Sequence, residues 1–227
     1  MFNTETFKKF YVTNYKEGAA YQAKATNGNT KLGKAIFNIN LPPVITCNPN
    51  APCFKECYGR KGHFLFASAQ NRMTMNLMAF CQNPDKFFYD IAMQTSLSKY
   101  VRWFGNGDMP NEEFLAGMCK VARKNRETKY LAFTKQYGVV NSYIAKGHKI
   151  PSNLKIVFSC WKDWKPENPY GFPTTWVRFP ETGKLAVENK AYNSLIPSNA
   201  FKCPSNCAEC QKCWHLSKKA SVEFHKH

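Results

Sequence analysis

The chain has 227 residues, of which 44% are hydrophobic, and its formal net charge is +17. This length can bury one substantial core, and the hydrophobic share argues against a disordered chain. The sequence has neither an apolar run of about 18 residues nor an N-terminal apolar segment followed by a cleavage site, so we expect a cytoplasmic protein with no membrane partner.

Segments typical of strands alternate with helical segments along the chain. The strand-like segments are residues 34–46, 100–104, 129–135, 154–161 and 174–179. The helical segments are residues 64–82, 83–100, 111–125 and 136–147. This alternation is typical of a parallel sheet with crossover helices. Because five strands are too few for a closed eight-stranded barrel, we expect an α/β fold, a partial (open) parallel β/α barrel.

The sequence shows no linker, internal repeat or low-complexity stretch, so we expect a single domain over residues 1–227. Its parts are an N-terminal extension (1–33), the partial β/α barrel (34–182) and a Cys-rich C-terminal segment (183–227).

Seven of the ten cysteines lie in two short loops. The N-terminal cysteine loop follows the first predicted strand with the spacing C-x5-C-x3-C, at Cys47, Cys53 and Cys57. The C-terminal cysteine loop has the spacing C-x3-C-x2-C-x2-C, at Cys203, Cys207, Cys210 and Cys213. In a reducing compartment, such clusters more often bind metal than form disulfides.

The spacing of the C-terminal cysteine loop favours an iron–sulfur cluster, because closely spaced thiolates can converge on one centre. Three thiolates in the N-terminal cysteine loop would leave one iron of a [4Fe-4S] cluster open to a small molecule. Two arrangements remain possible at this point. Either the seven thiols form a closed and an open iron–sulfur cluster, or a histidine, His63 or His215, completes a pair of structural zinc sites.

Five further residues lie at or beyond the carboxyl ends of predicted strands, where parallel β/α folds place their sites. They are candidates for binding a small-molecule ligand at the mouth of the barrel: Arg60, Asn106, Asp108, Lys135 and Trp161. Arg60 and Lys135 would pair with an anionic group. Trp161 could stack on a base.

The N-terminal cysteine loop resembles that of the radical S-adenosylmethionine superfamily. It follows the first strand of a partial barrel, and its last cysteine precedes an aromatic residue, Tyr58. The resemblance implies a [4Fe-4S] cluster on Cys47, Cys53 and Cys57, with S-adenosylmethionine at the open iron. The segment "GNGDMP" would receive the amino group of that cofactor. The superfamily spacing is C-x3-C-x2-C, so this chain departs from it.

From Gly28 to Trp214 the chain is also similar to a phage protein family, the gene product 88 family. The segments that carry this resemblance are "NTKLGKAIFNINLPP", "CFKECYGRKG", "VRWFGNGDMPN", "AFTKQY", "FSCW" and "CPSNCAECQKCWH". The resemblance implies a phage origin and hence the host cytoplasm. It does not indicate which reaction, if any, the protein catalyses.

The leading hypothesis is therefore a phage-type iron–sulfur protein, which as an enzyme would bind S-adenosylmethionine or a related small molecule. The alternative is a zinc-stapled basic protein that binds nucleic acid or a host protein. The charge of +17 favours an anionic partner, but the basic residues are dispersed rather than clustered. The sequence carries no signal for an oligomeric state.

Overall fold

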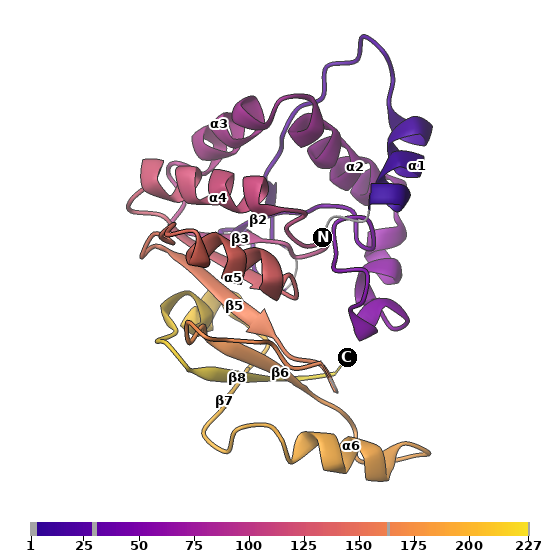
Figure 1. Ribbon diagram of the computed structural model, residues 1–227, viewed down its shortest axis with the longest axis vertical. Helices are drawn as coiled ribbons and strands as arrows, with labels where there is room; N and C mark the ends of the chain where they lie inside the picture. Colours follow the sequence, from indigo (N-terminus) through magenta and orange to yellow (C-terminus); the bar gives the residue numbers. More distant parts are fainter. Residues whose placement is uncertain (1–3, 29–30, 163, 227) are drawn as a thin grey trace.

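A computed structural model describes residues 4–28, 31–162 and 164–226 (Figure 1). Within these residues, eight strands form one open sheet in the order β1-β2-β3-β4-β5-β6-β8-β7. The strands are β1 (Thr26–Asn27), β2 (Phe37–Ile39), β3 (Tyr100–Trp103), β4 (Lys129–Thr134), β5 (Leu154–Ser159), β6 (Thr174–Arg178), β7 (Phe201–Lys202) and β8 (Ser221–His225). β1 pairs antiparallel with β2, and the other pairs are parallel. The predicted α/β class is confirmed, with an open and mostly parallel sheet. The finer prediction, a partial β/α barrel, stays a prediction.

The helices are α1 (Thr4–Asn14), α2 (Ala67–Gln82), α3 (Pro84–Thr95), α4 (Glu112–Lys124), α5 (Tyr137–Ala145), α6 (Ala186–Asn193) and α7 (Cys207–Cys210). The predicted start of α4 is confirmed, because Asn111 Oδ1 accepts a hydrogen bond from the amide of Phe114. Asn83 caps α3 in the same way. Side-chain caps of this kind satisfy amides that have no partner inside the helix.

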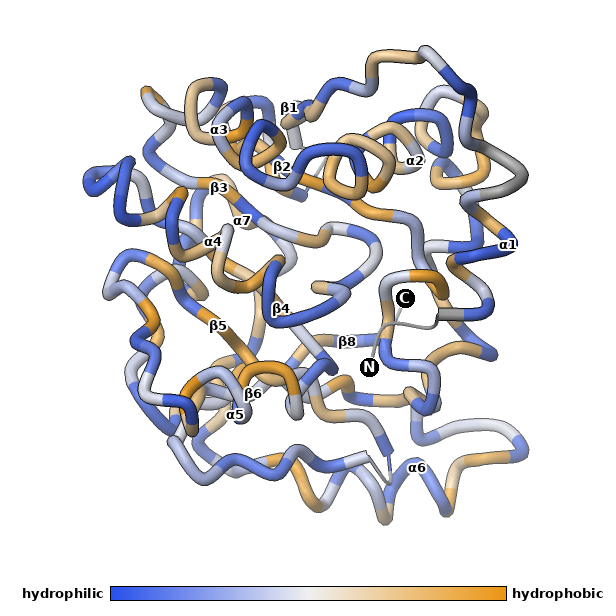
Figure 2. The backbone as a smooth tube through the Cα atoms, turned by 45° about the horizontal axis from the view of Figure 1, so that its top comes forward, coloured by the Kyte–Doolittle hydropathy of each residue, from blue (hydrophilic) through white to orange (hydrophobic). Residues whose placement is uncertain are grey.

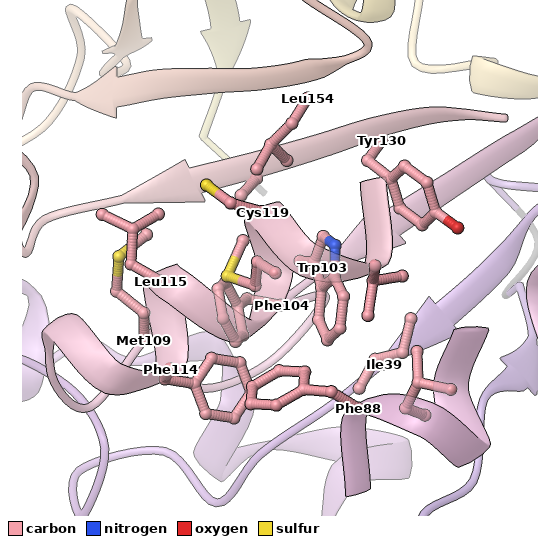
Figure 3. Packing of buried hydrophobic residues seen from close by; sticks show 14 of the residues in the cluster. Ile39, Phe88, Trp103, Phe104, Met109, Phe114, Leu115, Cys119, Tyr130 and Leu154 are labelled. Atoms are coloured by element: carbon pink, nitrogen blue, oxygen red, sulfur yellow. The ribbon is translucent and has the colours of Figure 1, made fainter. Parts of the chain in front are cut away.

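The two faces of the sheet carry different cores. Helices α2 to α5 contribute to the larger core with Val101, Trp103, Tyr130 and Ile156 of the strands. Figure 3 shows Trp103 beside Phe88 and Phe114 in this core. Tyr100, Leu131 and Val157 alternate with those strand residues and form a second core with the C-terminal segment. Side chains on a strand point to opposite faces in turn, so the hydrophobic colouring along β5 in Figure 2 reflects burial on both faces.

Two predictions about the strands were wrong. The first strand, expected at 34–46, extends only over Phe37–Ile39. Pro42 and Pro43 have no amide hydrogen to donate to a ladder, and Val44 has a φ of 71°, which no strand accommodates. The sheet also contains three more strands than the five expected, because β1 of the N-terminal segment and β7 and β8 of the C-terminal segment join it. β8 lies between β6 and β7.

Candidate functional site

The N-terminal cysteine loop is fixed to the turn that follows β3. The hydroxyl of Tyr58 donates a hydrogen bond of 2.5 Å to the carbonyl of Gly105. Asn106 is buried, and its Nδ2 donates to the carbonyl of Gly59 at 3.3 Å. The loop itself consists largely of short 3₁₀ turns, Pro52–Phe54 and Tyr58–Arg60. The sequence therefore folds this loop against the turn after the neighbouring strand.

Asp108 ties the loops after β3 and β4 together. Its carboxylate accepts hydrogen bonds from Thr134 Oγ1 at 2.7 Å and from the amides of Lys135 and Met109, each at 2.8 Å. Its own amide donates to Thr46 Oγ1, beside Cys47, at 3.1 Å. Burial raises the pKa of Asp108 to about 6, although the three donors act in the opposite direction. The carboxyl ends of β2, β3 and β4 thus meet at one edge of the sheet, as expected for parallel strands.

The thiols of the N-terminal cysteine loop lie near these groups. Burial raises the pKa of the Cys47 thiol, and Asp108, Cys57 and Cys53 interact with it electrostatically. Burial also raises the pKa of Cys53, whereas the ammonium of Lys135 lowers it. Cys47 and Cys53 thus lie near Asp108, Cys53 lies near Lys135, and Cys57 lies near the other two thiols.

Of the other predicted ligand-binding residues, Lys135 and Trp161 contact each other, whereas Arg60 is exposed. Lys135 Nζ lies 5.6 Å from the centre of the Trp161 ring, a cation–π contact. The Trp161 ring in turn packs edge-on against Phe179. Arg60 is exposed at the end of the Tyr58–Arg60 turn. The tryptophan is therefore already in contact with protein groups that can hold its ring in place.

The C-terminal cysteine loop packs on the opposite face from helices α2 to α5. Cys203, Cys207 and Cys213 contact the second core. Two backbone hydrogen bonds fix the first half of the loop. The amide of Cys203 donates to the carbonyl of Glu223, and the amide of Cys207 donates to the carbonyl of Lys31. Ser205 and Gln211 adopt positive φ angles of 62° and 51°, which turn the backbone sharply between the cysteines. The loop is thus folded back upon itself on the sheet.

The four thiols of this loop also lie near one another. Burial raises the pKa of Cys213 to about 12, and the interactions with Cys203, Cys207 and Cys210 act in the same direction. Burial raises the pKa of Cys207, with Cys203 and Cys210 contributing. A bound metal cation would reverse this effect, because it stabilises thiolates.

The candidate metal ligands do not converge on a common centre in the described part of the chain. Within residues 4–28, 31–162 and 164–226, no group of three or more His, Cys, Asp or Glu is placed so as to hold a metal ion. None of the ten cysteines, all of which are described, forms a disulfide. The donor sets still fit a thiophilic metal, since three and four free thiols gather in separate loops. For a metal to bind, these loops would have to move so that the sulfurs reach a common centre.

Arg102, which lies between Val101 and Trp103 in β3, was not among the residues predicted from the sequence. Its guanidinium interacts electrostatically with Tyr58 of the N-terminal cysteine loop and with Cys207 and Cys213 of the C-terminal loop. The alternation of side chains along a strand could have indicated this residue. Val101 and Trp103 are hydrophobic and share one face of the sheet, so Arg102 points to the other face.

The fold and these two loops define an open parallel α/β protein with two separate cysteine-rich loops, one at the carboxyl edge of the sheet and one on its face. The chain belongs to the gene product 88 family, a phage protein family whose sequence model matches residues 9–216. No curated protein and no solved structure matches the chain. The resemblance to the radical S-adenosylmethionine superfamily therefore rests on the sequence pattern alone. Among the described residues, no helix is long and apolar enough to span a membrane.

Proposed function

We propose that this phage-type protein binds iron–sulfur clusters through its two cysteine loops. Cys203, Cys207, Cys210 and Cys213 would hold a closed [4Fe-4S] cluster, and Cys47, Cys53 and Cys57 would hold a second one. The observation that supports the proposal best is the gathering of the three N-terminal thiols, Asp108 and Lys135 at the carboxyl edge of a parallel sheet. Parallel α/β folds bind their ligands at this edge.

The residues at this edge suit a ligand that carries both an anionic group and an aromatic base. The ammonium of Lys135 can pair with a carboxylate or phosphate, and the ring of Trp161 beside it can stack on a base. An open iron on the N-terminal cluster would supply a position for the amino-acid end of S-adenosylmethionine or of a related small molecule. As in other metal-ligand loops, the sulfurs would reach their final positions only when the metal binds.

Anaerobic purification tests the cofactor. The expected result is a brown protein that absorbs at about 400 nm and contains bound iron and sulfide. Cys53→Ser should then remove part of the iron, whereas Cys81→Ser, a matched change in helix α2, should leave it unchanged. A colourless protein that contains only zinc would overturn the proposal and favour the zinc-stapled alternative.

Spectroscopy of the reduced protein tests the small-molecule ligand. Addition of S-adenosylmethionine should perturb the cluster signal of the parent protein, and Cys53→Ser should abolish this response. If every cluster has four protein ligands and no spectrum changes, the N-terminal site is closed and its role is structural. Nucleic-acid binding that falls steeply between low and moderate salt would instead support the basic-protein alternative.

A further inference from the structure

Arg102 lies on the face of the sheet that carries the C-terminal cysteine loop. In the parallel register its neighbour in β4 is Leu131, which belongs to the second core. Its neighbours along β3, Val101 and Trp103, belong to the larger core on the opposite face. The guanidinium is thus directed toward the C-terminal segment rather than toward helices α2 to α5.

One nitrogen of the partly buried Arg102 side chain has no acceptor among the described residues. Its Nε is buried and has no hydrogen-bond partner within the part of the chain that the structure describes. The group lies over the ring of Phe133, 5.0 Å from the ring centre, which fixes its plane but does not satisfy its N–H donors. Buried donors are rarely left without a partner, so such a group calls for an explanation.

The cysteines of the C-terminal loop lie on the same face of the sheet, since Cys203, Cys207 and Cys213 pack against the second core to which Leu131 belongs. Arg102 interacts favourably with the ionised forms of both Cys207 and Cys213. The loop is held beside it by Trp214, whose indole Nε1 donates to the carbonyl of Val101 at 3.0 Å. This anchor therefore holds Trp214, which directly follows Cys213, against the strand residue that precedes Arg102.

We propose that Arg102 is a positioning residue of the C-terminal metal centre, where its guanidinium donates hydrogen bonds to the metal-bound thiolates of Cys207 and Cys213. The inference rests on the proposed function in one respect, that this loop binds a metal. Four thiolates with either a [4Fe-4S] core or Zn²⁺ carry a net charge of about −2. A guanidinium beside them offsets part of this charge and strengthens metal retention, whichever metal is bound.

Metal retention by purified variants tests this role. All three N-terminal thiols are first removed with Cys47→Ser, Cys53→Ser and Cys57→Ser, so that of the two cysteine loops only the C-terminal one can bind metal. In this background, Arg102→Gln should weaken Zn²⁺ retention against a competing chelator by about 10- to 100-fold. Arg102→Lys keeps the positive charge, so its Zn²⁺ retention should lie between that of Arg102→Gln and that of the parent. Arg126→Gln, a matched change at an exposed arginine, should leave retention unchanged.

The same proteins, reconstituted with iron and sulfide, provide a second measurement. Loss of the positive charge disfavours the reduced, more negative cluster, so the reduction potential of Arg102→Gln should be lower than that of the parent. If Arg102→Gln does not fold, Arg102→Met keeps the contact with Phe133 and takes its place in both measurements. Retention and potential equal to those of the parent would overturn the role of Arg102. A parent protein that binds no metal would overturn the proposed function itself.

Discussion

Gly59 and Asn106 are in contact so close that no other residue fits in place of the glycine. A Cβ added at Gly59 would lie 1.9 Å from Asn106 Oδ1. Asn106 cannot move away freely, because its Oδ1 accepts from the amide of Gly107 and its Nδ2 donates to the carbonyl of Gly59. This contact joins the N-terminal cysteine loop to the turn after β3.

Gly59→Ala should therefore displace the N-terminal cysteine loop. We expect a loss of about 1–3 kcal/mol in the free energy of unfolding, as for other overpacked positions, together with weaker metal binding by this loop. Gly138→Ala is the matched control, because an added Cβ there meets nothing within 4 Å. Within helix α5 it should be neutral or stabilising by up to about 1 kcal/mol. Urea denaturation measures both, and equal stability of the two variants would contradict the close contact.

Asp108→Asn should loosen the junction of the loops after β3 and β4. The amide of asparagine presents an NH₂ group where the carboxylate now accepts from Thr134 and from the amides of Lys135 and Met109. At least one buried donor then loses its acceptor, at a cost of about 1–3 kcal/mol.

The control for this change is Asp85→Asn. Asp85 pairs with Lys120 at 3.0 Å on the surface, with its side chain 88% exposed. Such a pair contributes at most about 1 kcal/mol, so thermal unfolding should change little. An Asp108→Asn protein as stable as Asp85→Asn would show that the carboxylate is not needed to hold the two loops.

The strand-end rule predicted the polar edge of the sheet well. Asn106, Asp108 and Lys135 follow β3 and β4 directly, and parallel strands place such residues at the same edge. The helix that begins after Asn111 was also predictable, because its cap is a local signal.

The C-terminal part of the sheet was not predictable in this way. β8 lies next to β6, although the two are separated in sequence by α6, β7 and the C-terminal cysteine loop. Its segment "SVEFH" contains Glu223, a charged residue that does not suggest a buried strand. The carboxylate is buried only because Arg178 of β6 pairs with it. Local propensity contains no information about such a distant partner.

Cys207→Ser and Cys210→Ser should each lower both metal content and soluble yield. Metal-ligand loops fold together with their metal, so the loss of one thiolate weakens the loop as well as the site. Cys81→Ser, outside both cysteine loops, should retain the metal content of the parent. Metal analysis and the yield of soluble protein check this. Full metal content and unchanged yield in both loop variants would exclude the C-terminal cysteines as ligands.

The ion pair between Glu223 and Arg178 predicts a stability that depends on pH. Arg178 donates through Nε and Nη2 to the two carboxylate oxygens, and this lowers the pKa of Glu223 below its usual value. The folded state therefore favours the ionised carboxylate. This contribution is complete above the pKa of the unfolded chain, 4.5, and is lost as the pH falls through the lower pKa of the folded protein.

Glu223→Gln should accordingly destabilise the protein by about 2–4 kcal/mol near pH 7, because the half-buried guanidinium of Arg178 loses its main partner. As the pH falls below the folded pKa, the parent loses the same contribution, and the two proteins should converge in stability. Glu188→Gln, at an exposed position in α6, should match the parent throughout. Urea midpoints measured across the acidic range decide the matter, since a difference that stayed constant with pH would mean that Glu223 does not act through its charge.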